Sequence, residues 1–189
     1  MVAWQMIHGD GEADASHAAR GSLPLRSDRT TRSLRWLGDT RRGNDLDVQV
    51  SITVREATAD DSAAIAALLA ELGYELSPAQ VAYELDNQPD TVVLVATADE
   101  TPAGLAAVNT RRQLHEAAPV STIDALVVTE GLRSQGIGEA LVRAAENLAR
   151  QRAACMLDLH SGLQRVDARR FYERMGLGVI GNHFIKALQ

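Results

Sequence analysis

The sequence predicts an α/β fold of the α+β kind, built on a mixed sheet in the order β-α-α-β-β-β-α-β-α-β. Short segments with alternating or β-branched apolar residues indicate strands, and longer segments with apolar residues at helical spacing indicate helices. Three predicted strands follow one another with only a turn or a loop between them, which favours an antiparallel meander. A helix joins the next pair of strands as a crossover, so the sheet is expected to be mixed rather than parallel and doubly wound.

The first elements have clear start signals. Apolar residues alternate with polar ones over residues 50–55, which predicts a half-buried strand. Thr58 and Asp61 have the spacing of a capping pair for a helix over residues 62–72. A Ser-Pro-Ala-Gln sequence then places serine at an N-cap and proline at the first position of a helix over residues 78–86.

The second half of the chain alternates between strands and helices. The predicted strands are 91–97, 103–112, 120–128, 154–160 and 179–188, and the predicted helices are 137–151 and 166–175. Turn residues over 99–102 connect the first two of these strands.

Residues 1–49 have a different composition from the rest of the chain. They contain seven arginines, seven acidic residues and little apolar periodicity. Such a segment buries too little surface to offset its ordering entropy. We therefore expect a mobile or loosely docked N-terminal extension over residues 1–49 and a folded domain over residues 50–189.

Composition narrows the classes of partner and location. The net charge of −6 disfavours nucleic acid and anionic membrane as partners. There is no membrane-spanning apolar run and no continuous apolar leader, and Cys155 is the only cysteine, so we expect a cytoplasmic protein. The histidines show no metal-ligand spacing, so no metal is expected.

The segment Arg133–Gly138 has the features of an anion-binding loop. It follows the apolar run 123–128 and opens a predicted helix, whose free N–H groups and dipole favour a phosphate. Lys186 is the only lysine, which excludes an ATP-type phosphate loop. A dinucleotide loop is disfavoured because Leu141 occupies the third glycine position and because Gly136 lies eight residues beyond the end of the strand.

This loop resembles the Arg/Gln-x-x-Gly-x-Gly/Ala loop of the GNAT superfamily of acyl-CoA-dependent N-acetyltransferases. The segment Ala168–Gly176 resembles the second signature of that family, Ala-x-x-Phe/Leu-Tyr-x-x-x-Gly. The resemblance covers about residues 51–189 and includes the order of elements. Two positions depart from it: Leu177, where an aromatic residue is usual, and Arg165, where many members carry an asparagine that braces the cofactor.

The resemblance implies acetyl-CoA as co-substrate and a set of positions that bind it. These cofactor-binding positions are Leu126, Val127, Val128, Arg133, Ser134, Gln135, Gly136, Ile137 and Gly138. The strand residues would bind the pantetheine arm through their main chain, and the loop would hold the pyrophosphate. Five arginines are candidates for the adenosine 3′-phosphate or for a solvated surface: Arg111, Arg112, Arg165, Arg169 and Arg170.

The resemblance also implies direct attack of a primary amine on the acetyl group. Tyr172 matches the position of the general acid, and a phenol stays protonated at neutral pH. Asp124 is the candidate base, with His160 or bulk water as alternatives. A non-catalytic module that binds acyl-CoA and regulates a partner is the alternative function.

The acceptor is expected to be a small-molecule or peptide amine, and the resemblance allows a homodimer. Acidic and aromatic residues near the two N-terminal helices form either a rim that favours a cationic amine or an ordinary solvated helix face. These residues are Glu71, Tyr74, Glu75, Tyr83, Glu84 and Asp86.

Overall fold

The computed structural model describes residues 34–36, 51–162 and 164–181. The described residues form one six-stranded sheet in the order β1-β2-β3-β4-β5-β6. The strands are β1 (Leu34–Trp36), β2 (Ile52–Glu56), β3 (Thr91–Ala98), β4 (Thr101–Arg111), β5 (Val120–Val128) and β6 (Met156–Leu159). Neighbouring strands are antiparallel from β1 to β5, and β6 pairs with β5 in parallel. The predicted mixed sheet is therefore confirmed.

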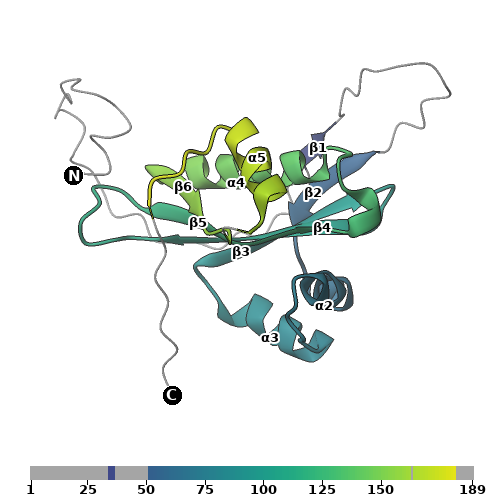
Figure 1. The fold of residues 1–189 in the computed structure, drawn as a ribbon. Coiled ribbons are helices and arrows are strands. Elements are labelled where there is room, and N and C mark those ends of the chain that lie inside the picture. Colours follow the sequence, from purple (N-terminus) through teal and green to yellow (C-terminus); the bar gives the residue numbers. More distant parts are fainter. Residues whose placement is uncertain (1–33, 37–50, 163, 182–189) are drawn as a thin grey trace.

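Helices cover both faces of the sheet, so the fold has three layers (Figure 1). The helices are α2 (Ser62–Glu71), α3 (Pro78–Asn87), α4 (Ile137–Gln151) and α5 (Val166–Arg174), with short 3-10 turns η1 (Ala59–Asp61) and η2 (Glu130–Leu132). Helices α2 and α3 lie on one face, and α4 and α5 lie on the other. None of the helices in the described ranges is long and apolar enough to cross a membrane.

The predicted element order holds from β2 to α5, and the differences lie at the two ends. Leu34–Trp36 pair with β2 as an extra edge strand that three residues of sequence are too short to signal. At the other end, residues 179–181 are irregular where a strand was expected. Residues 182–189, where that strand continues, and residues 1–33 and 37–50 of the predicted extension lie outside the described residues, so the domain boundary near residue 50 stays a prediction.

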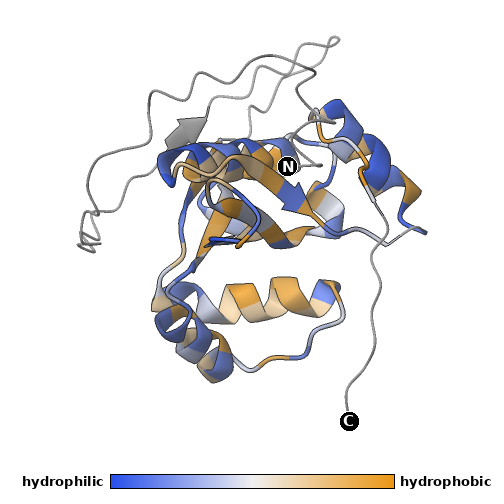
Figure 2. Ribbon diagram, turned by 90° about the vertical axis from the view of Figure 1, so that its left-hand side faces the viewer, coloured by the Kyte–Doolittle hydropathy of each residue, from blue (hydrophilic) through white to orange (hydrophobic). Residues whose placement is uncertain are grey.

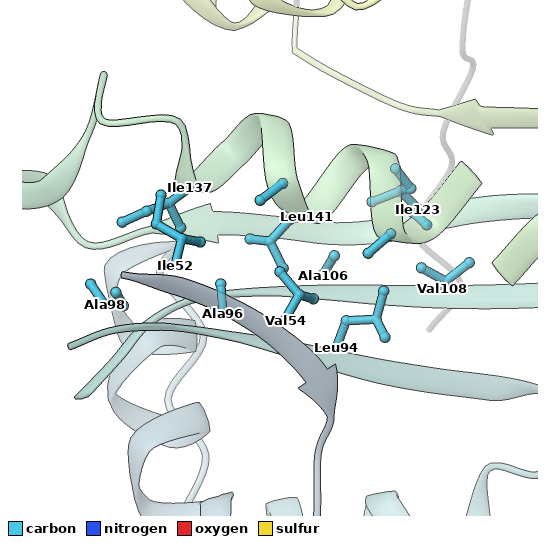
Figure 3. Close-up of a cluster of buried hydrophobic side chains, with 14 residues drawn as sticks. Ile52, Val54, Leu94, Ala96, Ala98, Ala106, Val108, Ile123, Ile137 and Leu141 are labelled. Atoms are coloured by element: carbon cyan, nitrogen blue, oxygen red, sulfur yellow. The ribbon is translucent and has the colours of Figure 1, made fainter. Parts of the chain in front are cut away.

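The core has one cluster on each face of the sheet. On the α4 face, Leu141 and Ile137 are almost fully buried against β2, β3 and β4 (Figure 3). On the other face, Ile65 and Leu68 of α2 pack against Leu105 of β4. Figure 2 shows α2 lengthwise below the sheet, apolar along most of its length, as expected for a helix packed between the sheet and α3. These two clusters hold β4 and β5 in the centre of the fold.

The predicted start of α3 at Ser77 is present, whereas the Thr58–Asp61 pair caps the turn η1 that precedes α2 rather than α2 itself. The Asp61 carboxylate accepts hydrogen bonds from the backbone N–H of Thr58, at 2.8 Å, and from its hydroxyl, at 3.1 Å. At α3, the Ser77 hydroxyl oxygen accepts from the Gln80 N–H, and the Gln80 side-chain oxygen accepts from the Ser77 N–H. These reciprocal bonds satisfy donors that a helix start leaves without a partner within the helix.

Arg55 and Asp61 form a bidentate ion pair between β2 and η1, with both N···O distances at 2.7 Å. The Asp61 side chain is only 7% exposed. The hydrogen bonds from Arg55 and then those from Thr58 outweigh burial and lower the pKa of Asp61 to about 2. Because the carboxyl has a pKa near ~3.9 in an unfolded chain, the ion pair stabilises the folded state above that pH.

We predict that Asp61→Asn lowers the free energy of unfolding at pH 7 by about 1–2 kcal/mol. The substitution removes the negative charge that pairs with the Arg55 guanidinium. The difference from wild type should shrink as pH falls from about 4 towards 2, where Asp61 itself becomes protonated. Urea unfolding at several pH values measures this difference, with Asp60→Asn as a control at the neighbouring exposed carboxylate. A difference that stays constant down to pH 2 would contradict the assignment.

Candidate active site

The site begins where β5 and β6 separate. The parallel pairing joins Val120–Ile123 to Met156–Leu159 and stops there. On its other side, β5 stays paired with β4 up to Val128. Residues 124–128 of β5 therefore have one edge that no described strand covers, and the main-chain groups on that edge are available to a ligand.

A β-bulge lies at the point of separation. The register between β4 and β5 shifts between Ala107 and Val108, which pair with Ala125 and Ile123, so Asp124 is the extra residue. A bulge bends its strand and changes the direction of the side chain it carries. It explains why Asp124 is exposed between buried Ile123 and the half-buried Ala125.

A cleft of about 290 Å³ opens at this separation. It is formed by the loop after α2, the middle of β5, the end of β6, the loop that follows β6 and the start of α5. Its lining residues are Leu72, Tyr74, Ile123, Asp124, Ala125, Leu126, Leu159, His160, Ser161, Gly162, Gln164, Arg165, Ala168 and Tyr172. Both predicted catalytic residues, Asp124 and Tyr172, thus lie in one cleft although 48 positions separate them in the chain.

Tyr172 lies on α5, and its ring packs beside that of Phe171 with 5.3 Å between the ring centroids. Burial raises the pKa of Tyr172 above its ordinary value of 10.0, and the nearby Arg165 charge partly opposes this shift. The phenol is therefore protonated at neutral pH and has a proton to donate.

Asp124 has a different electrostatic environment. Although Asp124 is exposed overall, partial desolvation by the surrounding cleft raises its pKa above the ordinary value of 3.8. The negative charge of Asp158 acts in the same direction, whereas the Arg111 and His160 charges oppose the increase. Raised pKa values of this kind are common at sites of proton transfer.

The glycine loop joins η2 to α4 with an unusual backbone. Ser134 and Gly136 both have positive φ, at 64° and 87°, and Gly136 is the N-cap of α4. Only glycine adopts this conformation without strain from a Cβ. The first N–H groups of α4 have no acceptor within the helix, so they and the positive end of its dipole suit an anion. Gln135 is half-buried in this loop.

Gly138 has a packing role that the sequence alone did not reveal. A Cβ at this position would lie 3.3 Å from Cζ of Phe171 and 3.8 Å from a methyl group of Val128. The missing side chain therefore lets the first turn of α4 approach α5 closely. Ile137 next to it is buried in the core, which leaves only its main chain for a ligand.

Arg133 is held at the end of β5. Its Nε donates to the Val128 carbonyl at 3.1 Å, and one Nη lies 3.7 Å from a Glu71 carboxylate oxygen. That same Glu71 oxygen accepts from the Glu130 backbone N–H at 3.2 Å. Glu71 thus links the end of α2 to the start of the glycine loop.

The predicted acidic rim does not form around the cleft. Of its six residues, only Tyr74 lines the cleft. Glu71 is engaged with the loop as described, and Glu84 accepts a hydrogen bond from the side chain of Gln88. The acidic residues of this set are therefore better interpreted as part of an ordinary solvated helix surface than as a rim that binds a cationic amine.

The loop after β6 contributes side chains to the cleft that no sequence pattern indicated. Ser161, Gln164 and Arg165 of that loop line the cleft. Their only signal in the sequence was the departure at Arg165 from the family pattern.

No group of three or more His, Cys, Asp or Glu side chains among the described residues is arranged to hold a metal ion.

A three-layer fold whose mixed sheet opens beside a helix-capping glycine loop is that of an acyltransferase. Residues 62–177 match the family described as the acetyltransferase (GNAT) family, and the chain belongs to this family. The resemblance found in the sequence is therefore confirmed, and the protein is an acyltransferase. Members of this family use acetyl-CoA as co-substrate.

One curated relative and several solved structures are similar to this chain. The chain is 31% identical over 154 residues to the aminoalkylphosphonate N-acetyltransferase of Salmonella typhimurium, a match that covers 75% of this chain and 95% of the relative. A crystal structure of a transcriptional regulator from Bacillus halodurans C-125 is similar with a TM-score of 0.66 and 26% identity, covering 72% of this chain and 99% of the other. The ribosomal-protein-alanine N-acetyltransferase of Brucella melitensis shares the fold, with a TM-score of 0.64 and 18% identity over 72% of this chain and 99% of that one.

Proposed function

We propose that this acyltransferase moves an acetyl group from acetyl-CoA to the primary amine of a small molecule. The observation that carries the proposal is the cleft at the separation of β5 and β6, which holds Tyr172 and Asp124 beside an uncovered strand edge. A proton donor, a carboxylate and free main-chain donors are the groups that this transfer requires.

The uncovered edge fits the extended arm of acetyl-CoA. The Thr129 N–H donates to the Ala103 carbonyl of β4. By strand alternation the main-chain groups of Val127 also point towards β4, while those of Leu126 and Val128 point towards the open side. The Val128 carbonyl is already bonded to Arg133, which leaves the Leu126 groups and the Val128 N–H for the arm. Val127 supports the strand through its buried side chain.

The glycine loop, residues 133–138, follows this strand edge after the short turn η2. We assign the pyrophosphate to the N–H groups of Ser134, Gln135, Gly136, Ile137 and Gly138, and to the charge of Arg133. A main-chain cradle of this kind depends on backbone conformation, which the positive φ values of Ser134 and Gly136 provide.

The two cleft residues supply the proton transfers. A primary alkyl amine has a pKa near ~10.4 and must lose a proton before it attacks the acetyl carbonyl carbon. Asp124 takes this proton, directly or through water, and the new C–N bond forms as the C–S bond breaks. The Tyr172 hydroxyl gives its proton to the departing sulfur, and the extra proton on the new amide nitrogen returns to the Tyr172 phenolate, directly or through water. The N–H near Leu126 polarises the carbonyl oxygen.

The dimensions of the cleft favour a small acceptor. At about 290 Å³ it lies at the lower end of the range for small-molecule sites. The curated relative is an aminoalkylphosphonate N-acetyltransferase, so aminoalkylphosphonates are the first acceptors to test here.

A cytoplasmic location and a homodimer stay predictions from the sequence.

The proposal predicts release of free thiol when the protein is mixed with acetyl-CoA and a suitable primary amine. A panel of aminoalkylphosphonates, amino acids, polyamines and aminoglycosides tests it, with the matching tertiary amines as controls that have no N–H to lose. Acetyl-CoA should also raise the melting temperature, since binding stabilises the folded state. Stabilisation without turnover by any amine would favour the non-catalytic acyl-CoA-binding module instead.

Tyr172→Phe should lower kcat by about 10²–10⁴-fold, because it removes the proton donor for the departing sulfur. The KM for acetyl-CoA should change little, since the ring and its packing against Phe171 are kept. Steady-state kinetics measure both, with Tyr83→Phe on the exposed surface of α3 as the matched control. Because burial raises the pKa of Tyr172, wild-type activity should show no loss at pH 8–9 from ionisation of this phenol. An unchanged kcat in Tyr172→Phe rules out the acid role.

Asp124→Asn should remove the acid limb of the kcat/KM profile. The base must be ionised, so the rate falls as pH drops through the raised pKa of Asp124, and asparagine does not titrate in this range. The measurement is kcat/KM between pH 4 and 9 for wild type, Asp124→Asn and His160→Gln. If the limb persists in the first variant and vanishes in the second, His160 is the base.

A further inference from the structure

We propose that the acceptor carries an anionic group in addition to its amine, and that Arg165 binds this group. The inference rests on the proposed function and concerns the acceptor end of the same cleft. It assigns to Arg165 a role in acceptor specificity, distinct from the catalytic roles of Asp124 and Tyr172.

The charges that line the cleft support a zwitterionic ligand. Apart from His160, its charged residues are one carboxylate, Asp124, and one guanidinium, Arg165. The acceptor amine must give a proton to the Asp124 carboxylate. The Arg165 guanidinium then remains to bind a different group of the acceptor. A purely cationic acceptor would meet repulsion from Arg165, whereas an anionic group would be attracted to it.

Three other arginines of this region already have acidic partners, and Arg111, whose charge acts on Asp124, does not line the cleft. Arg133 lies 3.7 Å from Glu71, Arg169 lies 2.9 Å from Glu173 and Arg170 lies 3.8 Å from Asp167. Arg165 forms no ion pair with any residue that the structure describes, although its charge is close enough to influence Tyr172. A guanidinium in this position suits a phosphonate or a carboxylate, which it binds through two parallel hydrogen bonds.

Two backbone hydrogen bonds fix the position of the Arg165 main chain. Its N–H donates to the Gly162 carbonyl at 3.0 Å, and its own carbonyl accepts from the Arg169 N–H at 3.0 Å. Arg165 is also the N-cap residue of α5, where the helix dipole favours a negative charge. The main chain is thus anchored while the side chain is exposed in the cleft, as expected for a residue that binds a small ligand.

No acid of the predicted rim neutralises this charge. Only Tyr74 of that rim lines the cleft, and Glu71 is engaged with Arg133 and Glu130. Asp124 therefore selects the amine and Arg165 selects the anion. The competing role for Arg165 is contact with acetyl-CoA, since the family resemblance places a cofactor-bracing asparagine at this position.

The test compares acceptors that differ only in the second charge. For 2-aminoethylphosphonate and 3-aminopropanoate, Arg165→Gln should raise KM about 10–100-fold, because a charge-assisted pair of hydrogen bonds is lost. For propylamine, which has no anionic group, KM should change less than about twofold, and so should the KM for acetyl-CoA. Arg165→Lys should restore part of the loss, and Arg174→Gln, an exposed arginine at the end of the same helix, is the control.

Three results would overturn the inference. A raised KM for acetyl-CoA with both kinds of amine would assign Arg165 to the co-substrate. An equal loss of kcat with both amines, at unchanged KM, would mean that Arg165 acts only through Tyr172. A preference of the wild type for propylamine over the anionic amines would exclude an anion site.

Failure of the proposed function is distinguishable from failure of this inference. If the wild type acetylates no amine, calorimetric titration of 2-aminoethylphosphonate into the protein with CoA still reports on the anion site. Binding that Arg165→Gln weakens about tenfold or more supports the inference without turnover. Equal binding by wild type and variant, or no binding by either, overturns it.

Discussion

The separation of β5 from β6 is the constraint on which the rest of the site depends. Strand β5 pairs with β4 along its whole length but leaves β6 after Ile123, at the bulge formed by Asp124. Helix α2 packs against Ala125 and Val127 on one face of this part of β5, and the cluster around α4 packs against Leu126 and Val128 on the other. The uncovered strand edge, the exposure of Asp124 and the cleft beside it all follow from this single change in pairing.

Helix packing connects the two ends of the proposed reaction. Gly138 at the start of α4 lies against Phe171 of α5, and the ring of Tyr172 packs beside that of Phe171. The start of α4 therefore contacts the helix that carries the proposed proton donor. On the opposite side, Glu71 connects α2 to the glycine loop through Glu130 and Arg133. The loop is thus a junction of both helical layers, which explains why its sequence was the most informative part of the chain.

The sequence predicted the parts of the fold in which local pattern and burial agree. The bounds of α4 and β5 match the predicted ranges, because their apolar residues follow the helical and strand periods over many positions. The bulge at Asp124 could not be predicted, because it depends on register with β4 rather than on the period of β5 itself. Periodicity also says nothing about which surface charges meet, so the engagement of Glu71 by Arg133 and the place of Arg165 in the cleft required the structure.

The proposed contacts to the two substrates differ in kind: one set uses main-chain groups and the other uses side chains. The proposed contacts to acetyl-CoA use backbone groups of β5 and of the loop before α4, which depend on conformation and tolerate many side chains. The proposed acceptor end uses side chains from the loops after α2 and β6 instead, where Tyr74, Gln164 and Arg165 line the cleft. Loop residues are free to change without disturbing the two buried clusters that hold the sheet. Arg165 belongs to the loop after β6 and lines the cleft with its side chain, which is the position from which the proposed anion site would select the acceptor.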